Sequence, residues 1–99
     1  MIVHLVVFRW KPGVTAEQIG ALERGLGGLP AVIEELREYR FGPDLGLRDG
    51  NGDFGIAATV DDADGLAAYL EHPEHRRVVE ELVRPIVELR LAAQISPAA

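Results

Sequence analysis

Cysteine is absent from the 99-residue sequence, and serine occurs once, as Ser96 near the carboxyl end. Without cysteine there is neither a disulfide framework nor thiolate chemistry, which fits a reducing compartment. A catalytic serine is not expected, because the single serine lies in a terminal tail. No apolar run approaches the length of a membrane span, and Met1 leads directly into a strand-like segment instead of a basic leader. We therefore expect a cytoplasmic protein with no membrane partner.

Positive charge is also scarce. The chain has 10 Lys and Arg residues against 16 Asp and Glu residues, and its formal net charge is −6. Such a surface repels phosphate backbones, so nucleic acid is not expected as a partner. Arg76, Arg77 and Arg84 are spread along one segment among glutamates, which is typical of a solvated helix face with ion pairs.

What the sequence does contain is an alternation of strand-like and helix-like segments. Thr15 and Gln18 form a capping box for a first helix that ends at Gly27-Gly28, followed by a short connection over residues 29–35. Aspartates at 61–64 begin a second helix, interrupted at His72-Pro73 and ending near Pro85. Strands are predicted over residues 2–10, 36–41, 54–60 and 89–95. The order β-α-β-β-α-β predicts one α+β domain over residues 1–99 with an antiparallel sheet.

The first strand is apolar on both faces. One face carries His4, Val6 and Phe8, and the other carries Val3, Leu5 and Val7. Two helices in this element order lie on the same side of the sheet and cover only one face. If Val3, Leu5 and Val7 stayed in water, the protein would lose roughly 1.5–3 kcal/mol of burial free energy per side chain. The total is comparable with the stability of a small domain. The C-terminal tail is too short to cover this face, so we predict a homodimer packed sheet to sheet.

A glycine-rich loop over residues 42–53 contains Asp49, Asn51 and Asp53 in alternation. Calcium loops alternate in this way, but their sixth residue is glycine and their twelfth is glutamate, whereas Phe54 and Val60 occupy those positions here. We interpret the stretch as turn chemistry, with metal binding as the less favoured alternative. No metal site and no other cofactor is predicted.

Three polar side chains are predicted to point into the layer between sheet and helices. His75 precedes Val78 by three residues on an apolar helical stripe, Tyr69 follows Leu66 by three, and His4 shares its strand face with Val6. Such groups are costly to bury without hydrogen-bond partners, and their convergence favours a pocket.

Each of the three also has a structural interpretation. Tyr69 taken alone is typical of a core aromatic residue, His4 of a satisfied core histidine, and His75 of a residue that makes a structural hydrogen bond at a helix start. His72 lies off the apolar stripe, and we expect it to be structural or exposed.

Several motifs along the chain form a recognisable set. They are the opening His4-Leu5-Val6-Val7-Phe8, the turn Lys11-Pro12-Gly13, Gly42-Pro43-Asp44-Leu45, Asp53-Phe54, and Tyr69-Leu70-Glu71-His72-Pro73-Glu74-His75. From His4 to about Ile95 they resemble the stress-responsive α/β-barrel (Dabb) family, and the Tyr-x-x-His-Pro-x-His stretch is the most specific part. The resemblance implies a ferredoxin-like protomer that pairs into a dimeric α+β barrel.

The resemblance also implies a function. Some relatives are polyketide cyclases, which close a linear poly-β-ketone by aldol condensation in a cavity lined by residues matching Tyr69, His75 and His4. The hypothesis is a cofactor-independent cyclase or lyase acting on a ketone-bearing acyl substrate. His75 would be the base, Tyr69 the oxyanion donor, and His4 would orient the substrate or tune His75. The expected apolar substrate contacts are Val6, Phe8, Leu22, Leu26 and Val79.

The alternative is a protein without chemistry. Many members of the family have no assigned activity and are known only as stress-induced. Under this hypothesis the dimeric barrel binds a small hydrophobic molecule or is purely protective.

Overall fold

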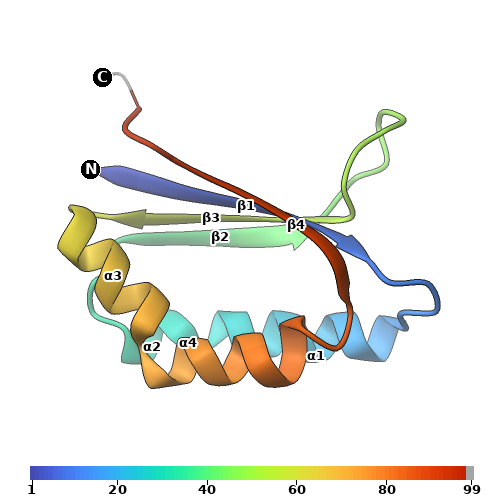
Figure 1. Ribbon diagram of the computed structural model, residues 1–99, viewed down its shortest axis with the longest axis horizontal. Coiled ribbons are helices and arrows are strands. Elements are labelled where there is room, and N and C mark those ends of the chain that lie inside the picture. The colour runs from blue at the N-terminus through green and yellow to red at the C-terminus, as the bar shows by residue number, and fades with distance from the viewer. Residues whose placement is uncertain (98–99) are drawn as a thin grey trace.

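A four-stranded antiparallel sheet organises the computed structural model, which describes residues 1–97. Its spatial order is β2-β3-β1-β4, so that β1 and β3 are the central strands. The strands are β1 (Ile2–Trp10), β2 (Glu38–Pro43), β3 (Phe54–Val60) and β4 (Val87–Ile95). Figure 1 shows that the helices all lie beneath one face of this sheet.

Two helical segments connect the strands. The first consists of α1 (Ala16–Gly27) and the single turn α2 (Leu29–Val32); the second consists of α3 (Ala63–Glu71), α4 (Pro73–Val78) and the π-helical turn η1 (Val79–Val83). The predicted β-α-β-β-α-β order and the ferredoxin-like fold are therefore confirmed. Within residues 1–97 no helix is both long and apolar enough to cross a membrane.

Helix starts follow the side chains that cap them. Thr15 and Gln18 form the predicted capping box, in which the Thr15 hydroxyl accepts from the Gln18 backbone N–H at 3.2 Å. Asp62 caps α3 by accepting from the backbone N–H of Gly65 at 2.8 Å. Each cap satisfies an N–H group that has no partner within the helix.

Two strand boundaries differ from the prediction. The second strand was predicted over residues 36–41, but β2 begins at Glu38 and ends at Pro43. Leu36 is held in a turn, because its backbone N–H donates to the carbonyl of Ile33 at 3.2 Å. The last strand begins at Val87, two residues before the predicted start, because the β1–β4 ladder already pairs Val87 with Trp10.

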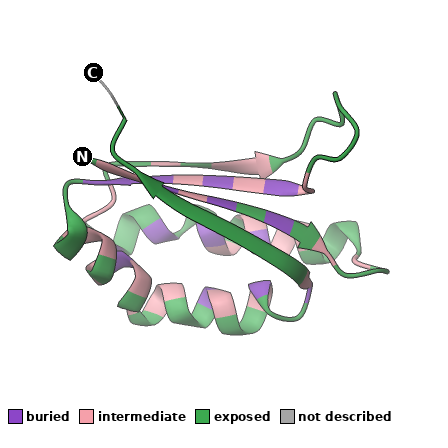
Figure 2. Ribbon diagram, turned by 45° about the horizontal axis from the view of Figure 1, so that its top comes forward, coloured by how far each residue is buried: buried purple, intermediate pink, exposed green. Residues whose placement is uncertain are grey.

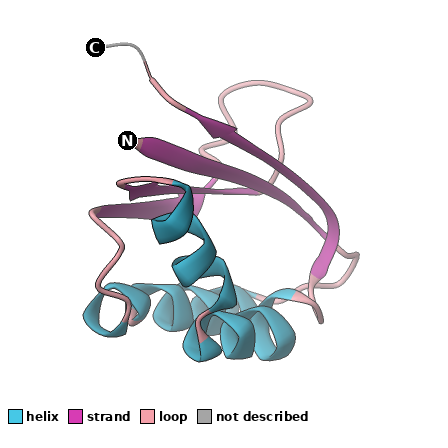
Figure 3. Cartoon of the chain, turned by 60° about the vertical axis from the view of Figure 1, so that its left-hand side comes forward, coloured by secondary structure: helices cyan, strands magenta, loops and turns pink. Residues whose placement is uncertain are grey.

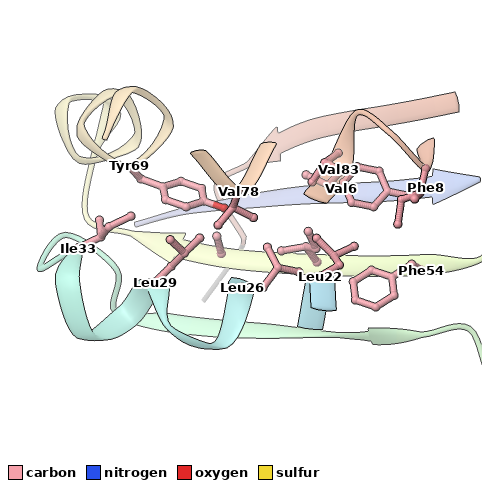
Figure 4. Packing of buried hydrophobic residues seen from close by; sticks show 13 residues of the cluster. Val6, Phe8, Leu22, Leu26, Leu29, Ile33, Phe54, Tyr69, Val78 and Val83 are labelled. Atoms are coloured by element: carbon pink, nitrogen blue, oxygen red, sulfur yellow. The ribbon is translucent and has the colours of Figure 1, made fainter. Parts of the chain in front are cut away.

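The core lies between the sheet and the helices. His4, Val6 and Phe8 of β1 are buried on this side, and the register places Val6 beside Ile56 of β3. Leu22 and Leu26 of α1 pack against the same layer, as Figure 4 shows. In Figure 2 the buried residues of β1 and β3 alternate with less buried ones, which is the period expected of strands with one covered face.

The opposite face of the sheet is apolar, and no helix of residues 1–97 covers it (Figures 1 and 3). On this side of the β1–β4 ladder, Val7 pairs with Leu91 and Val3 pairs with Ile95. Leu91 is 64% exposed, and Val7, Leu89 and Ile95 are between 44% and 45% exposed. We call this surface the outer face, defined by Val3, Leu5, Val7, Leu89, Leu91, Ala93 and Ile95.

Candidate functional site

A cavity of about 230 Å³ lies between the helix-facing side of β1 and the last helices. Four polar side chains reach it: His4, Tyr69, His75 and Arg90. The rest of its lining is apolar and consists of Val6, Phe8, Leu26, Ile56, Leu70, Val78, Val79 and Val83. The structure thus brings the three polar residues predicted from the sequence to one enclosed space.

The break between α3 and α4 positions His75. Pro73 has no backbone N–H to continue the α3 ladder, and the Glu74 N–H donates instead to Nδ1 of His72 at 3.1 Å. His72 is therefore the N-cap of α4, a structural role. The carbonyl of Leu70, which the Glu74 N–H would bond in a continuous helix, is left to accept from another group.

That group is the imidazole of His75. Its Nδ1 lies 3.1 Å from the Leu70 carbonyl oxygen, and since a carbonyl only accepts, Nδ1 carries the proton. Nε2 of the neutral ring then holds the lone pair. This atom bonds no group among residues 1–97. Because no fully buried side-chain nitrogen or oxygen among these residues lacks a partner, Nε2 keeps some exposed surface, and its ring lines the cavity.

Burial lowers the pKa of His75, and the positive charge of Arg90 lowers it further, although the hydrogen bond to Leu70 acts in the opposite direction. The ring is therefore neutral at neutral pH. A neutral imidazole with a fixed Nδ1–H and an accessible Nε2 has the protonation state that a general base requires.

His4 has the opposite tautomer. Its Nδ1 lies 2.8 Å from Nε2 of Gln94, a nitrogen that only donates, so Nδ1 accepts and Nε2 carries the proton. Burial is the main cause that lowers the pKa of His4, followed by the charges of Arg90 and His75. The two imidazoles that line the cavity are therefore opposite tautomers: Nε2 of His75 has a lone pair, and Nε2 of His4 has a proton.

The ring of Tyr69 is close to both imidazoles. Its centroid is 4.5 Å from that of His75 and 6.2 Å from that of His4, and the side chain is 2% exposed. Figure 4 shows it projecting from α3 toward Val78. Its hydroxyl oxygen is 3.0 Å from that of Tyr39 on β2. Burial raises the pKa of both phenols, so both keep their protons at neutral pH.

The family model described as "Stress responsive A/B Barrel Domain" matches residues 2–96. The chain belongs to the Dabb family. The family prediction made from the motifs is confirmed by this match.

The chain is similar to several known proteins, including the following three. The uncharacterized protein SCO4036 of Streptomyces coelicolor is 41% identical over 81 residues, which are 77% of this chain and 80% of that protein. A dimeric ferredoxin-like protein of unknown function from Thermobifida fusca YX is 42% identical, with a TM-score of 0.90 over 97% of this chain and 90% of that one. The hydroxynitrile lyase from Passiflora edulis is 20% identical, with a TM-score of 0.82 over 95% and 90% of the two chains, and this likeness shows the fold alone.

Four of the five predicted apolar contacts line the cavity of this Dabb chain: Val6, Phe8, Leu26 and Val79. Leu22 does not. It is fully buried in the core, and α1 directs it into the packed layer beside the cavity. On α3, Tyr69 is the buried residue, whereas Leu66 and Leu70 are half-buried.

Three residues of the site were not predicted from the sequence: Tyr39, Gln94 and Arg90. Tyr39 alternates with Phe41 on β2, a spacing that would have placed both on the core face. Gln94 and Arg90 lie on the helix-facing side of β4 only because of the β1–β4 register, which pairs them with His4 and Phe8.

The loop between β2 and β3 uses its carboxylates to hold its own shape. Asp44 accepts from the Gly46 N–H at 2.8 Å and from the Asn51 side chain at 3.1 Å, and Asp53 accepts from the Trp10 N–H at 2.8 Å. Within residues 1–97, no group of three or more His, Asp or Glu side chains is arranged to hold a metal ion.

Proposed function

We propose that the protein is a cofactor-independent enzyme that removes a proton from a carbon acid next to a carbonyl, as a cyclase or lyase does. One observation carries the proposal: the ring of His75 lines a largely apolar cavity that His4 and Tyr69 also line, its Nδ1 is held by Leu70, and its Nε2 bonds no group among residues 1–97. General-base assistance of this kind typically contributes about 10²–10⁴-fold.

In the proposed reaction, Nε2 of His75 takes a proton from a carbon adjacent to a ketone, and the electron pair moves to the carbonyl oxygen as an enolate. The Nε2–H of His4 donates to that oxygen. Tyr69 donates to it as well when Tyr39 supplies the proton of the hydrogen bond between the two phenols. The enolate carbon then bonds to a second carbonyl carbon of the same molecule, and the new alkoxide receives the proton back from His75.

Lyase chemistry uses the same groups in the reverse direction. His75 would deprotonate a hydroxyl, a carbon–carbon bond would break, and the released carbanion would receive the proton. The Passiflora edulis protein of the same fold is named a hydroxynitrile lyase. The cavity of about 230 Å³ is below the roughly 300–1,000 Å³ of pockets for drug-sized ligands, which favours a small substrate.

The test is deuterium exchange into a small ketone, because exchange reports proton removal without requiring the natural substrate. The α-protons of 2-pentanone in D₂O are followed by NMR with the wild type and with His75→Gln, whose amide can still donate to Leu70. We expect the variant to lose roughly 100-fold or more of the protein-catalysed rate, and Tyr69→Phe to lose about tenfold or more.

The matched control is His72→Asn, which removes an imidazole outside the cavity and leaves an acceptor to cap α4. It should exchange at the wild-type rate. If His75→Gln is folded by circular dichroism and exchanges as fast as the wild type, the base assignment is wrong.

A second candidate is a non-catalytic protein that binds a small apolar molecule. It is favoured by the fact that every imidazole and phenol at the cavity already has a partner within the fold: Gln94 for His4, Tyr39 for Tyr69, and Leu70 for His75. This candidate predicts that the wild type exchanges 2-pentanone no faster than free imidazole at the same concentration.

We also propose that two copies pair through the outer face. The exposed apolar side chains of β1 and β4 support this, since leaving each in water costs roughly 1.5–3 kcal/mol. The similar Thermobifida fusca protein is described as dimeric. Pairing through this face would leave the cavity, on the other side of the sheet, open to substrate.

A further inference from the structure

We infer that Arg90 binds a carboxylate at the mouth of the cavity, so that the ligand of this site is a small carboxylic acid with an apolar body. The inference concerns the same cavity as the proposed function and names its substrate class. It depends on binding alone and holds whether or not the bound molecule reacts.

The register places Arg90 at the cavity. It is paired with Phe8 in the β1–β4 ladder, and its side chain shares the helix-facing side with Gln94, which is paired with His4. Arg90 is an exposed residue that also lines the cavity, so it lies at the boundary between the cavity and solvent. Among the lining residues it is the one that carries a full charge at neutral pH.

Arg90 has no anionic partner within the described part of the chain. The ion pairs among residues 1–97 engage Arg37, Arg40, Arg77 and Arg84. A guanidinium that is held beside an apolar cavity without a carboxylate of its own is available to an incoming one. Arginine binds carboxylates through two parallel N–H···O bonds, and such charge-assisted bonds are stronger than neutral ones.

The charge of Arg90 also acts inside the cavity. After burial, it is a further cause of the lowered pKa of His4 and His75, and it opposes the burial that raises the pKa of Tyr69, so its charge favours a negative group in this space over a positive one. The site therefore selects against cationic ligands. One guanidinium suits a monoanion such as a carboxylate better than a phosphate dianion, for which no second cation lines the cavity.

The arrangement orients the ligand. Arg90 lies beside Phe8, whereas His4 is four residues away along β1, a distance of roughly 13 Å between backbone positions. A carboxylate on Arg90 places the apolar body against Val6 and Val83, and directs the far end of the molecule toward His4 and His75.

The test compares pentanoate with pentanamide, which differ in charge and share the apolar chain. Dissociation constants for the full-length protein are measured by NMR titration at low ionic strength. We expect pentanoate to bind about tenfold more tightly than pentanamide, which corresponds to about 1.4 kcal/mol. In Arg90→Gln the ratio should fall to about one, with the affinity for pentanamide unchanged.

The matched control is Arg76→Gln, which removes the same charge from the exposed side of α4, outside the cavity. It should keep the wild-type ratio. The inference is overturned if neither probe binds, if the two probes bind the wild type equally, or if both variants reduce pentanoate binding to the same extent. None of these outcomes depends on turnover, so failure here is distinguishable from failure of the exchange experiment with His75→Gln.

Discussion

Nδ1 of His75 donates a hydrogen bond of 3.1 Å to the carbonyl of Leu70 across the break between α3 and α4. The bond exists because Pro73 lacks an N–H and because the Glu74 N–H is taken by His72. A helix break that looks like an interruption in the sequence therefore fixes which nitrogen of His75 is basic.

The histidine tautomers provide the first prediction. We expect His75 to be protonated on Nδ1 and His4 on Nε2, because the first donates to a carbonyl and the second accepts from an amide. His72 should resemble His4, since its Nδ1 accepts from the Glu74 N–H. Nitrogen-15 shifts in long-range proton correlation spectra distinguish the two forms. Observation of Nε2–H as the main form of His75 would contradict the proposed base.

The second prediction concerns pH. The folded-state pKa values of His4 and His75 are lowered, first of all by burial, so the unfolded chain binds more protons as the pH falls. Their contribution to stability is complete above the pKa of a histidine in the unfolded chain, about 6.5. It is lost as the pH falls below that value toward the lower pKa values of the folded state. We expect the free energy of unfolding in urea to decrease between about pH 7.5 and about pH 5.5.

Substitution of the two histidines tests the cause of this dependence. In His75→Gln the decrease should be smaller, and in the double variant with His4→Gln smaller still, because neither amide titrates. If the free energy of unfolding decreases with falling pH as steeply in the double variant as in the wild type, other titratable groups cause the pH dependence.

The third prediction concerns the two phenols, whose hydroxyl oxygens are 3.0 Å apart. Tyr39→Phe should destabilise the protein by about 0.5–1.5 kcal/mol, the usual net value of one hydrogen bond. Tyr69→Phe should cost a similar amount, and the double variant should cost less than the sum. A double-mutant cycle in urea measures this coupling. Strict additivity would mean that the phenols do not stabilise each other.

The fourth prediction concerns the outer face. The protein should sediment at about twice its chain mass of 10.8 kDa, and Leu91→Glu should shift it toward the monomer because a carboxylate would be buried between the sheets. Analytical ultracentrifugation measures both. Val32→Glu, an exposed apolar position on α2 at the helical side, should leave the mass unchanged. A wild type that sediments as a monomer at all concentrations would exclude the pairing.

The fold was predictable because local signals agree with tertiary packing in most elements. The first strand is apolar and β-branched, and Thr15 and Gln18 mark the start of α1. The start of β2 was placed two residues early because Leu36 has the composition of a strand residue. Its backbone is committed to a turn that only the folded chain reveals.

The site was predictable in part. His4 alternates with apolar residues along a strand, and Tyr69 and His75 each lie three residues from an apolar residue on a helix. These spacings were sufficient to assign all three side chains to the layer between sheet and helices. Arg90 was not found, because β4 places its polar residues toward the helices and its leucines on the outer face. In an isolated strand this alternation is normally interpreted the other way round, with the polar side in solvent.

The turn η1 closes on the fifth residue, with the Arg84 N–H bonded to the Val79 carbonyl at 2.9 Å. Val78 and Val83 consequently both face the cavity, whereas residues five apart on an α-helix point roughly 140° apart. Deleting a single residue between them would place the two valines four apart, about 40° apart on an ordinary α-helix, and so would keep them on one face. The wide turn therefore lets this segment hold one residue more than an α-helix would while both valines stay on the cavity side.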